Sequence, residues 1–146
     1  MMKLVVFTSL HDAARTAMAA GFFNAFTLPS LVRGMAGALL HEPPVGREVV
    51  EAMSDVGIDA VPPRVVKPED LRSAFMVVTF ADAPSFPVPG VRAERWDVPD
   101  PRKLPPARLR EVRDRLREQV WKLVAREGWY KLQPASIVAR MAAQPR

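Results

Sequence analysis

The chain of 146 residues has no cysteine, and its only histidines are His11 and His41. The absence of cysteine excludes disulfides, thiolate metal ligands and a thiol nucleophile. Two imidazoles without thiolates offer too few ligands for the common metal sites of proteins. We therefore expect neither a metal nor a cofactor, and a fold that is held together by its apolar core.

Long apolar runs are also missing. Lys3 precedes a short apolar segment, but His11, Asp12 and Arg15 interrupt it well before a signal-peptide core or a membrane span is complete. The sequence thus predicts a cytoplasmic protein that does not enter a membrane. With 49% hydrophobic residues, a chain of this length suits one globular domain with a substantial core.

Positive charge exceeds negative charge by +5, and the excess lies in one segment. Residues 102–126 contain nine Lys and Arg against three acids, a net charge of +6 that leaves −1 for the rest of the chain. Such a stripe can bind nucleic acid, but opposite charges four residues apart are typical of a solvated helix face. The pairs so spaced are Arg110 with Asp114, Glu111 with Arg115 and Glu118 with Lys122. We favour the solvated face and do not expect nucleic acid as a partner.

The N-terminal segment has the pattern of a strand, a loop and a helix. Leu4 to Phe7 form the continuous apolar run that is typical of a strand buried on both faces. Met18, Phe22 and Phe26 recur at helical spacing, which predicts a helix beginning near residues 14–16. A loop that ends at a helix N-terminus presents unpaired N–H groups and can cradle an anion, with Arg15 at its rim.

The rest of the chain alternates between strand and helix patterns. Strands are predicted at 31–35, 75–80 and 91–96, and helices at 68–72, from about 105 to 127, and around an apolar face of Val49, Val50, Met53 and Val56. A loop is predicted between Gly37 and Gly46, and the scattered tryptophans Trp96, Trp121 and Trp129 are expected to pack in or beside the core. We predict an α/β three-layer sandwich with a central four-stranded parallel sheet and a binding crevice at the carboxyl ends of its strands.

Arg15 and Thr16, at the start of the first helix, carry a resemblance to a known family. Their setting resembles the low-molecular-weight protein tyrosine phosphatases and thioredoxin-coupled arsenate reductases, whose signature is Cys, five residues, then Arg and Ser or Thr. Ser9 stands where that signature has its nucleophilic cysteine. The resemblance implies an anion-binding segment of Leu10, His11, Asp12, Ala13, Ala14, Arg15 and Thr16.

Three later segments extend the resemblance to residues 3–127. Val56 to Asp59 is similar to a Gly-Ile-Asp element of the reductases, and Ala81 stands where they place the first resolving cysteine. Residues 97–101 resemble the Asp-Pro element in which Asp100 would be the general acid. The chain is thus expected to consist of a phosphatase-like domain, 1–128, and a C-terminal tail, 129–146.

The same residues also depart from the chemistry of that family. A helix N-terminus and an arginine can convert a thiol to a thiolate, but they leave an alcohol such as Ser9 neutral. His11 and Asp12 replace the usual Gly and Asn, and Asp12 places a negative charge where an anion would bind. Arg15 can clamp a tetrahedral oxyanion or neutralise Asp12, and Asp100 can be a general acid or a turn residue before Pro101.

Three functions follow as hypotheses. The first is a catalytically degenerate protein that binds an oxyanion (phosphate, sulfate or arsenate) or a protein partner and acts in regulation. The second is an active phosphatase-like or arsenate-reductase-like enzyme with a modified site that uses Ser9, Arg15 and Asp100. The third is an acidic-partner or nucleic-acid binder that uses Arg108, Arg110, Arg113 and Arg117. We favour the first and do not expect an enzyme; an active protein would be a phosphatase, a phosphoric monoester hydrolase, rather than a reductase.

Overall fold

The computed structural model describes residues 2–9, 12–39, 44–80 and 88–131. Its sheet contains five parallel strands in the order β3-β2-β1-β4-β5. The strands are β1 (Lys3–Ser9), β2 (Val32–Ala38), β3 (Arg64–Val65), β4 (Met76–Phe80) and β5 (Arg92–Trp96). The predicted α/β class is confirmed, and the sheet has one strand more than expected: the two-residue β3, which follows the extended Pro62–Pro63 segment.

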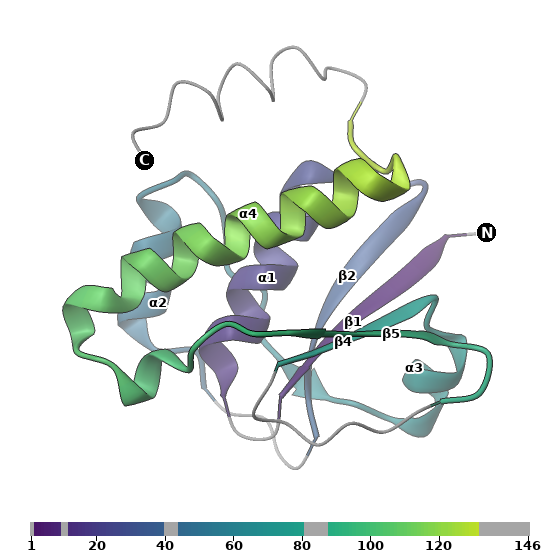
Figure 1. Ribbon diagram of the computed structural model, residues 1–146, viewed down its shortest axis with the longest axis horizontal. Coiled ribbons are helices and arrows are strands. Elements are labelled where there is room, and N and C mark those ends of the chain that lie inside the picture. The colour runs from purple at the N-terminus through teal and green to yellow at the C-terminus, as the bar shows by residue number, and fades with distance from the viewer. Residues whose placement is uncertain (1, 10–11, 40–43, 81–87, 132–146) are drawn as a thin grey trace.

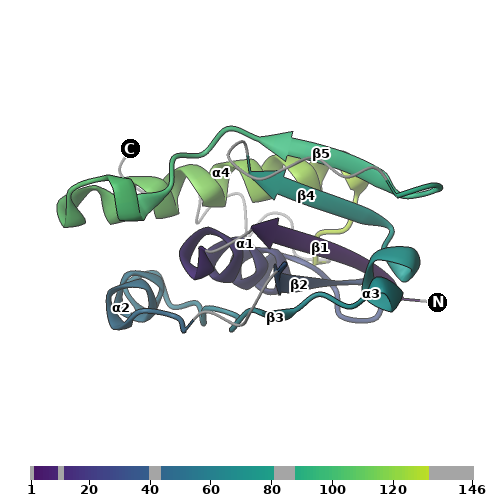
Figure 2. The same ribbon diagram turned by 90° about the horizontal axis from the view of Figure 1, so that it is seen from below.

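Helices cover both faces of the sheet, as a three-layer sandwich requires (Figure 1). They are α1 (Ala13–Phe26), α2 (Arg47–Ser54), α3 (Pro68–Ser73) and α4 (Leu109–Glu127), with 3-10 turns η1 (Pro101–Lys103) and η2 (Pro106–Arg108) before α4. The larger core packs α1, α2 and α4 against one face, and a smaller core of Val6, Met35, Ala74 and Val77 lies beside α3 on the other. Figure 2 shows the strands side by side in this order, from β5 at the top through β4, β1 and β2 to β3 at the bottom.

Helix α1 is buried along most of its length because it packs against the sheet on one side and α4 on the other. Its residues 13–23 are all buried, which is the pattern of a helix enclosed by other elements. Gly21 allows close approach of the segment before β3, since a Cβ at this position would lie 2.5 Å from the carbonyl oxygen of Asp59. This packing places the N-terminus of α1 near the carboxyl end of β1.

Three sequence predictions need correction. The predicted loop from Gly37 begins later, because β2 continues through Ala38 in register with Ser9 of β1. Helix α4 begins at Leu109 and not near residue 105. Pro105 and Pro106 lack an N–H donor; Pro105 is the N-cap of the 3-10 turn η2 and Pro106 is its first residue, and this turn precedes α4. Val50, assigned to the apolar face of α2, is half exposed, whereas Val49 and Met53 are buried.

The expected ion pairs along α4 are also mostly different. Only Glu118 with Lys122 forms as predicted, at 3.3 Å. Arg110 instead reaches Asp55 at the end of α2, and Arg113 is buried, donating to the carbonyl oxygen of Ala52. The helix face therefore makes tertiary contacts as well as contacts with solvent.

The tryptophans pack as predicted, and one of them begins the C-terminal tail. Trp96 and Trp129 are buried, and Trp121 packs against the core. Trp129 lies edge-on to Phe23 and Phe75, and residues 132–146 lie outside the described residues. Within the described part of the chain, no helix is both long and apolar enough to cross a bilayer.

Candidate functional site

The candidate site lies at the carboxyl ends of β1, β4 and β5, where α1 begins (Figure 1). Asp12 is the N-cap of α1, with extended backbone angles of φ −92° and ψ 120°. Its carboxylate accepts hydrogen bonds from the backbone N–H groups of Ala14 at 2.7 Å and Arg15 at 3.2 Å. These are N–H groups that a helix start leaves without intrahelical partners, so Asp12 satisfies part of the predicted anion cradle itself.

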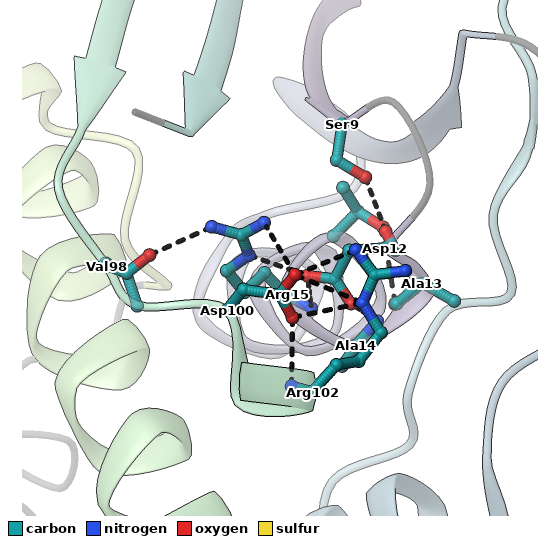
Figure 3. Close-up of polar contacts among 9 residues, drawn as sticks. Ser9, Asp12, Ala13, Ala14, Arg15, Val98, Asp100 and Arg102 are labelled. Carbon is teal, nitrogen blue, oxygen red and sulfur yellow. Dashed lines mark hydrogen bonds and ion pairs between the residues drawn. The ribbon is translucent and has the colours of Figure 1, made fainter. Parts of the chain in front are cut away.

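The Arg15 side chain is folded inward, with only 2% of its surface exposed (Figure 3). Its Nε donates to Oδ2 of Asp12 at 2.6 Å, and its Nη1 donates to the carbonyl oxygen of Val98 at 2.9 Å. Its Nη2 lies 3.9 Å from Oδ2 of Asp100, and the guanidinium packs over the Phe80 ring. The sequence left two anions open as the partner of Arg15, a bound oxyanion or the carboxylate of Asp12. In this structure Arg15 pairs with Asp12.

Ser9 ends β1 and is buried. Its hydroxyl donates to the carbonyl oxygen of Asp12 at 2.5 Å, and Thr16 donates to the carbonyl oxygens of Asp12 and Ala13. The proton of the Ser9 hydroxyl is therefore engaged by a carbonyl group, which cannot act as a general base. The contact joins the last residue of β1 to the residue that caps α1.

Asp100 precedes η1 and is buried, with its side chain only 2% exposed. It accepts hydrogen bonds from the backbone N–H of Arg102 at 2.9 Å and from Nη2 of the same residue at 2.8 Å. Burial raises the pKa of Asp100, but these hydrogen bonds and the charges of Arg15 and Arg102 together hold that pKa below its ordinary value. Asp100 is therefore an ionised carboxylate at neutral pH.

A pocket of about 220 Å³ adjoins the buried guanidinium. Its lining consists of Arg15, Asp97, Val98, Pro99, Asp100, Lys103 and Leu104. The volume is below the 300–1,000 Å³ that is usual for drug-sized ligands, so it suits a small molecule or one side chain of a partner.

The structure brings the predicted residues Ser9, Asp12, Arg15 and Asp100 together, with Ala13, Ala14 and Thr16 in the first turn of α1. Leu10 and His11 lie outside the described residues. Sequence reasoning missed the carbonyl oxygen of Val98 and the side chain of Arg102 as partners; the second could have been suspected from its place two residues after Asp100. Within the described ranges, no three His, Asp or Glu residues are placed to hold a metal ion.

Comparison with known proteins gives likeness in structure only. No protein-family model and no curated protein matches the chain. Among solved structures, an arsenate reductase from Archaeoglobus fulgidus has 25% sequence identity and a TM-score of 0.65, with 83% of this chain and 98% of that chain covered. A second arsenate reductase, in the reduced state, has 22% identity and a TM-score of 0.70, with 86% and 98% covered.

A phosphatase has the same architecture. The low-molecular-weight protein tyrosine phosphatase from T. tengcongensis has 20% identity and a TM-score of 0.68, with 85% of this chain and 99% of that chain covered. These matches confirm the resemblance drawn from Ser9, Arg15 and Asp100 at the level of the fold. The chain thus has the fold that arsenate reductases share with low-molecular-weight protein tyrosine phosphatases, and it has this fold without a single cysteine.

Proposed function

We propose that this chain is a catalytically degenerate protein of the arsenate reductase and low-molecular-weight phosphatase fold, which binds an oxyanion or a protein partner and acts in regulation. The observation that carries the proposal is the state of Ser9. It is an alcohol in the place of the expected thiol, and its hydroxyl donates to the carbonyl oxygen of Asp12. An alcohol without a neighbouring base stays neutral and is a poor nucleophile.

The role of general acid, which the resemblance assigns to Asp100, is also unsupported. A general acid must carry a proton that it can give to the leaving group. Asp100 is ionised at neutral pH because its pKa is lowered, and Arg102 holds its carboxylate. Two of the three catalytic positions thus lack the protonation state that the family's reaction needs.

The binding parts of the site are retained better than the catalytic parts. Arg15 stays buried at the start of α1, and the adjoining pocket is bounded by apolar Val98 and Leu104 and by the exposed Lys103. A buried arginine and an adjoining pocket, without the nucleophile, support a regulatory protein built on an enzyme fold, although a fold alone never decides function.

Turnover by the purified protein tests the proposal against the alternative of an active enzyme with a modified site. Hydrolysis of p-nitrophenyl phosphate, and arsenate reduction with thioredoxin or glutathione, should not exceed the rates of Ser9→Ala and Arg15→Ala. Ser9→Ala removes only the hydroxyl, so it is the closer control. Arsenate reduction needs a thiol that is oxidised as arsenate gains two electrons, and this chain has none. A wild-type rate clearly above both variants would establish an enzyme.

A further inference from the structure

The carboxylate of Asp12 makes the contacts that a bound oxyanion would make at this site. It accepts from the N–H of Ala14 at 2.7 Å, from the N–H of Arg15 at 3.2 Å and from Nε of Arg15 at 2.6 Å. Backbone N–H groups at a helix start and a guanidinium are the donors that proteins commonly offer to phosphate-like anions. All three donors are directed at one side chain of the same chain (Figure 3).

Burial makes this contact different from an ordinary surface pair. The side chains of Asp12 and Arg15 are each only 2% exposed. The carbonyl oxygen of Val98 and the carboxylate of Asp100 hold the far side of the guanidinium. Arg15 therefore cannot turn toward an incoming anion without losing several buried contacts, and such losses are costly.

The charge of the cluster is already balanced. Asp12 and Asp100 supply two negative charges, and Arg15 and Arg102 supply two positive charges. A free oxyanion that entered with Asp12 in place would add uncompensated negative charge in a buried position, which is unfavourable. Its entry requires that the Asp12 carboxylate leave the donors first.

We propose that Asp12 is an internal ligand that occupies the anion donors at the start of α1, the N–H groups of Ala14 and Arg15 and the guanidinium of Arg15, and closes them to free oxyanions. The contact is autoinhibitory: a ligand gains the donors of Ala14 and Arg15 only by displacing the Asp12 carboxylate. This inference rests on the proposed function in one respect, that the loop is a site of binding and not of reaction. It specifies how access to that site is controlled.

The experiment compares phosphate binding by the full chain and by variants at residue 12. Asp12→Asn removes the charge and keeps a good N-cap, and Asp12→Gly removes the whole side chain at small cost to the cap. Asp55→Asn is the matched control, because it also removes one carboxylate that pairs with an arginine, Arg110, but at a half-exposed site at the C-cap of α2. Isothermal titration with phosphate, and thermal unfolding in phosphate, formate and chloride at equal ionic strength, give the readouts.

We expect the wild type and Asp55→Asn to respond to phosphate as they respond to chloride. Asp12→Gly should unfold at a lower temperature in chloride, regain stability in phosphate or formate, and bind phosphate at least roughly tenfold more tightly than the wild type. Asp12→Asn should bind with intermediate affinity. If Asp12→Gly does not fold in chloride, recovery of folding by formate or phosphate gives the same support.

Two results would overturn the inference. One is phosphate binding by the wild type that equals that of the Asp12 variants, because the loop would then be open already. The other is folded Asp12→Asn or Asp12→Gly protein without any response specific to phosphate or formate, because the donors would then not form an anion site. Turnover by the wild type would instead refute the proposed function and would leave this binding comparison intact.

Discussion

At the scale of single residues, Asp100 shows how burial and neighbouring cations compete. Burial raises its pKa, and the hydrogen bonds of Arg102 with the charges of Arg15 and Arg102 lower it further than burial raises it. A carboxyl group whose pKa is lower in the folded protein stabilises that protein above its ordinary pKa of about 4. This contribution is lost as the pH falls through the lowered folded value.

Asp100→Asn should therefore destabilise the protein in a pH-dependent way. At pH 7 the variant removes the buried charge that pairs with Arg102 and lies 3.9 Å from Nη2 of Arg15, while Arg15 keeps its contact with Asp12. We expect a loss of about 1–3 kcal/mol in the free energy of unfolding. The loss should shrink progressively as the pH falls below about 4, because the unfolded chain is protonated first and the folded wild type only as the pH falls through its lowered pKa. Urea unfolding at pH 7 and at pH 3 measures both values.

Asp97→Asn is the control, because Asp97 lies in the same segment but is exposed. Its effect should stay within about 0.5 kcal/mol at either pH. An Asp100→Asn loss that is equally large at pH 3 would show that the contacts of the neutral side chain, and not its charge, account for the stabilisation.

Substitutions at Ser9 test the chemistry of the candidate site. Ser9→Cys alone should restore little phosphatase activity, because Asp12 occupies the donors of Ala14 and Arg15 that would stabilise both a thiolate and a bound phosphate. The triple variant Ser9→Cys, His11→Gly and Asp12→Asn should be at least roughly tenfold more active, a gain that corresponds to about 1.4 kcal/mol of barrier. Hydrolysis of p-nitrophenyl phosphate measures the difference.

Asp12→Asn with Ser9 retained is the control for this series and should remain inactive. A single Ser9→Cys variant that is as active as the triple variant would mean that the Asp12 carboxylate is no obstacle to the reaction. The explanation of inactivity would then rest on the missing thiol alone.

At the scale of elements, replacing Gly21 of α1 by alanine has two opposing effects on the stability of the protein. Replacing a mid-helix glycine by alanine gains about 1 kcal/mol in helix propensity. Here the added Cβ would lie 2.5 Å from the carbonyl oxygen of Asp59 and 3.0 Å from Cε of Met53, and the first contact is to backbone. We expect Gly21→Ala to destabilise the protein by about 1–3 kcal/mol in net terms, since overpacking costs more than the propensity gain.

Thermal unfolding checks this value, with Gly46→Ala as the control. A Cβ at Gly46 would meet the carboxylate end of Glu48, which is a flexible side chain and can move away. Its effect should be small. A stabilised Gly21→Ala variant would show that the segment around Asp59 yields easily and does not fix the position of α1.

The elements that were predictable from sequence are those whose signal is local. The apolar runs of β1 and β4 and the helical spacing of apolar residues in α1 predicted an alternation of strands and helices, and hence the parallel sheet. The exposure of Val50 and the burial of Arg113 were not predictable, because both depend on how α2 lies against α4. The predicted pair of Arg110 with Asp114 is absent for the same reason, because Arg110 instead reaches Asp55 at the C-cap of α2.

The candidate site, like the fold, has features that were predictable from the sequence and features that were not. The family resemblance at Ser9, Arg15 and Asp100, together with the alternation of strands and helices, implied that these residues meet at one end of the sheet, and they do. The partner of Arg15 could not be predicted, because a guanidinium can bind a free oxyanion as well as the carboxylate of Asp12. The fold decides it by placing the carbonyl oxygen of Val98 where it fixes the guanidinium beside Asp12.

At the scale of the whole molecule, the net charge of +5 does not by itself make a nucleic-acid surface. Several arginines near α4 are paired with acids of the chain, namely Arg108 with Glu111, Arg110 with Asp55, Arg117 with Asp114 and Arg126 with Glu94. Paired cations attract phosphates less than free cations do, because binding must first break or share the existing pair. The charge excess is therefore spread over a surface that is already partly neutralised.

We therefore expect only weak binding to nucleic acid. Anisotropy of a labelled duplex at physiological salt should give a dissociation constant no tighter than the roughly 10⁻⁴–10⁻⁶ M of non-specific binding. The double variant Arg108→Glu, Arg110→Glu reverses two charges at exposed positions and should change this constant by no more than about tenfold, since no groove-reading element depends on them. A dissociation constant below about 10⁻⁷ M would contradict the expectation, provided that it weakens steeply with salt and is lost in the double variant. In that case the arginines of α4 must release Asp55 and Glu111 on binding, and the helix, not the loop at Asp12, would be the functional surface.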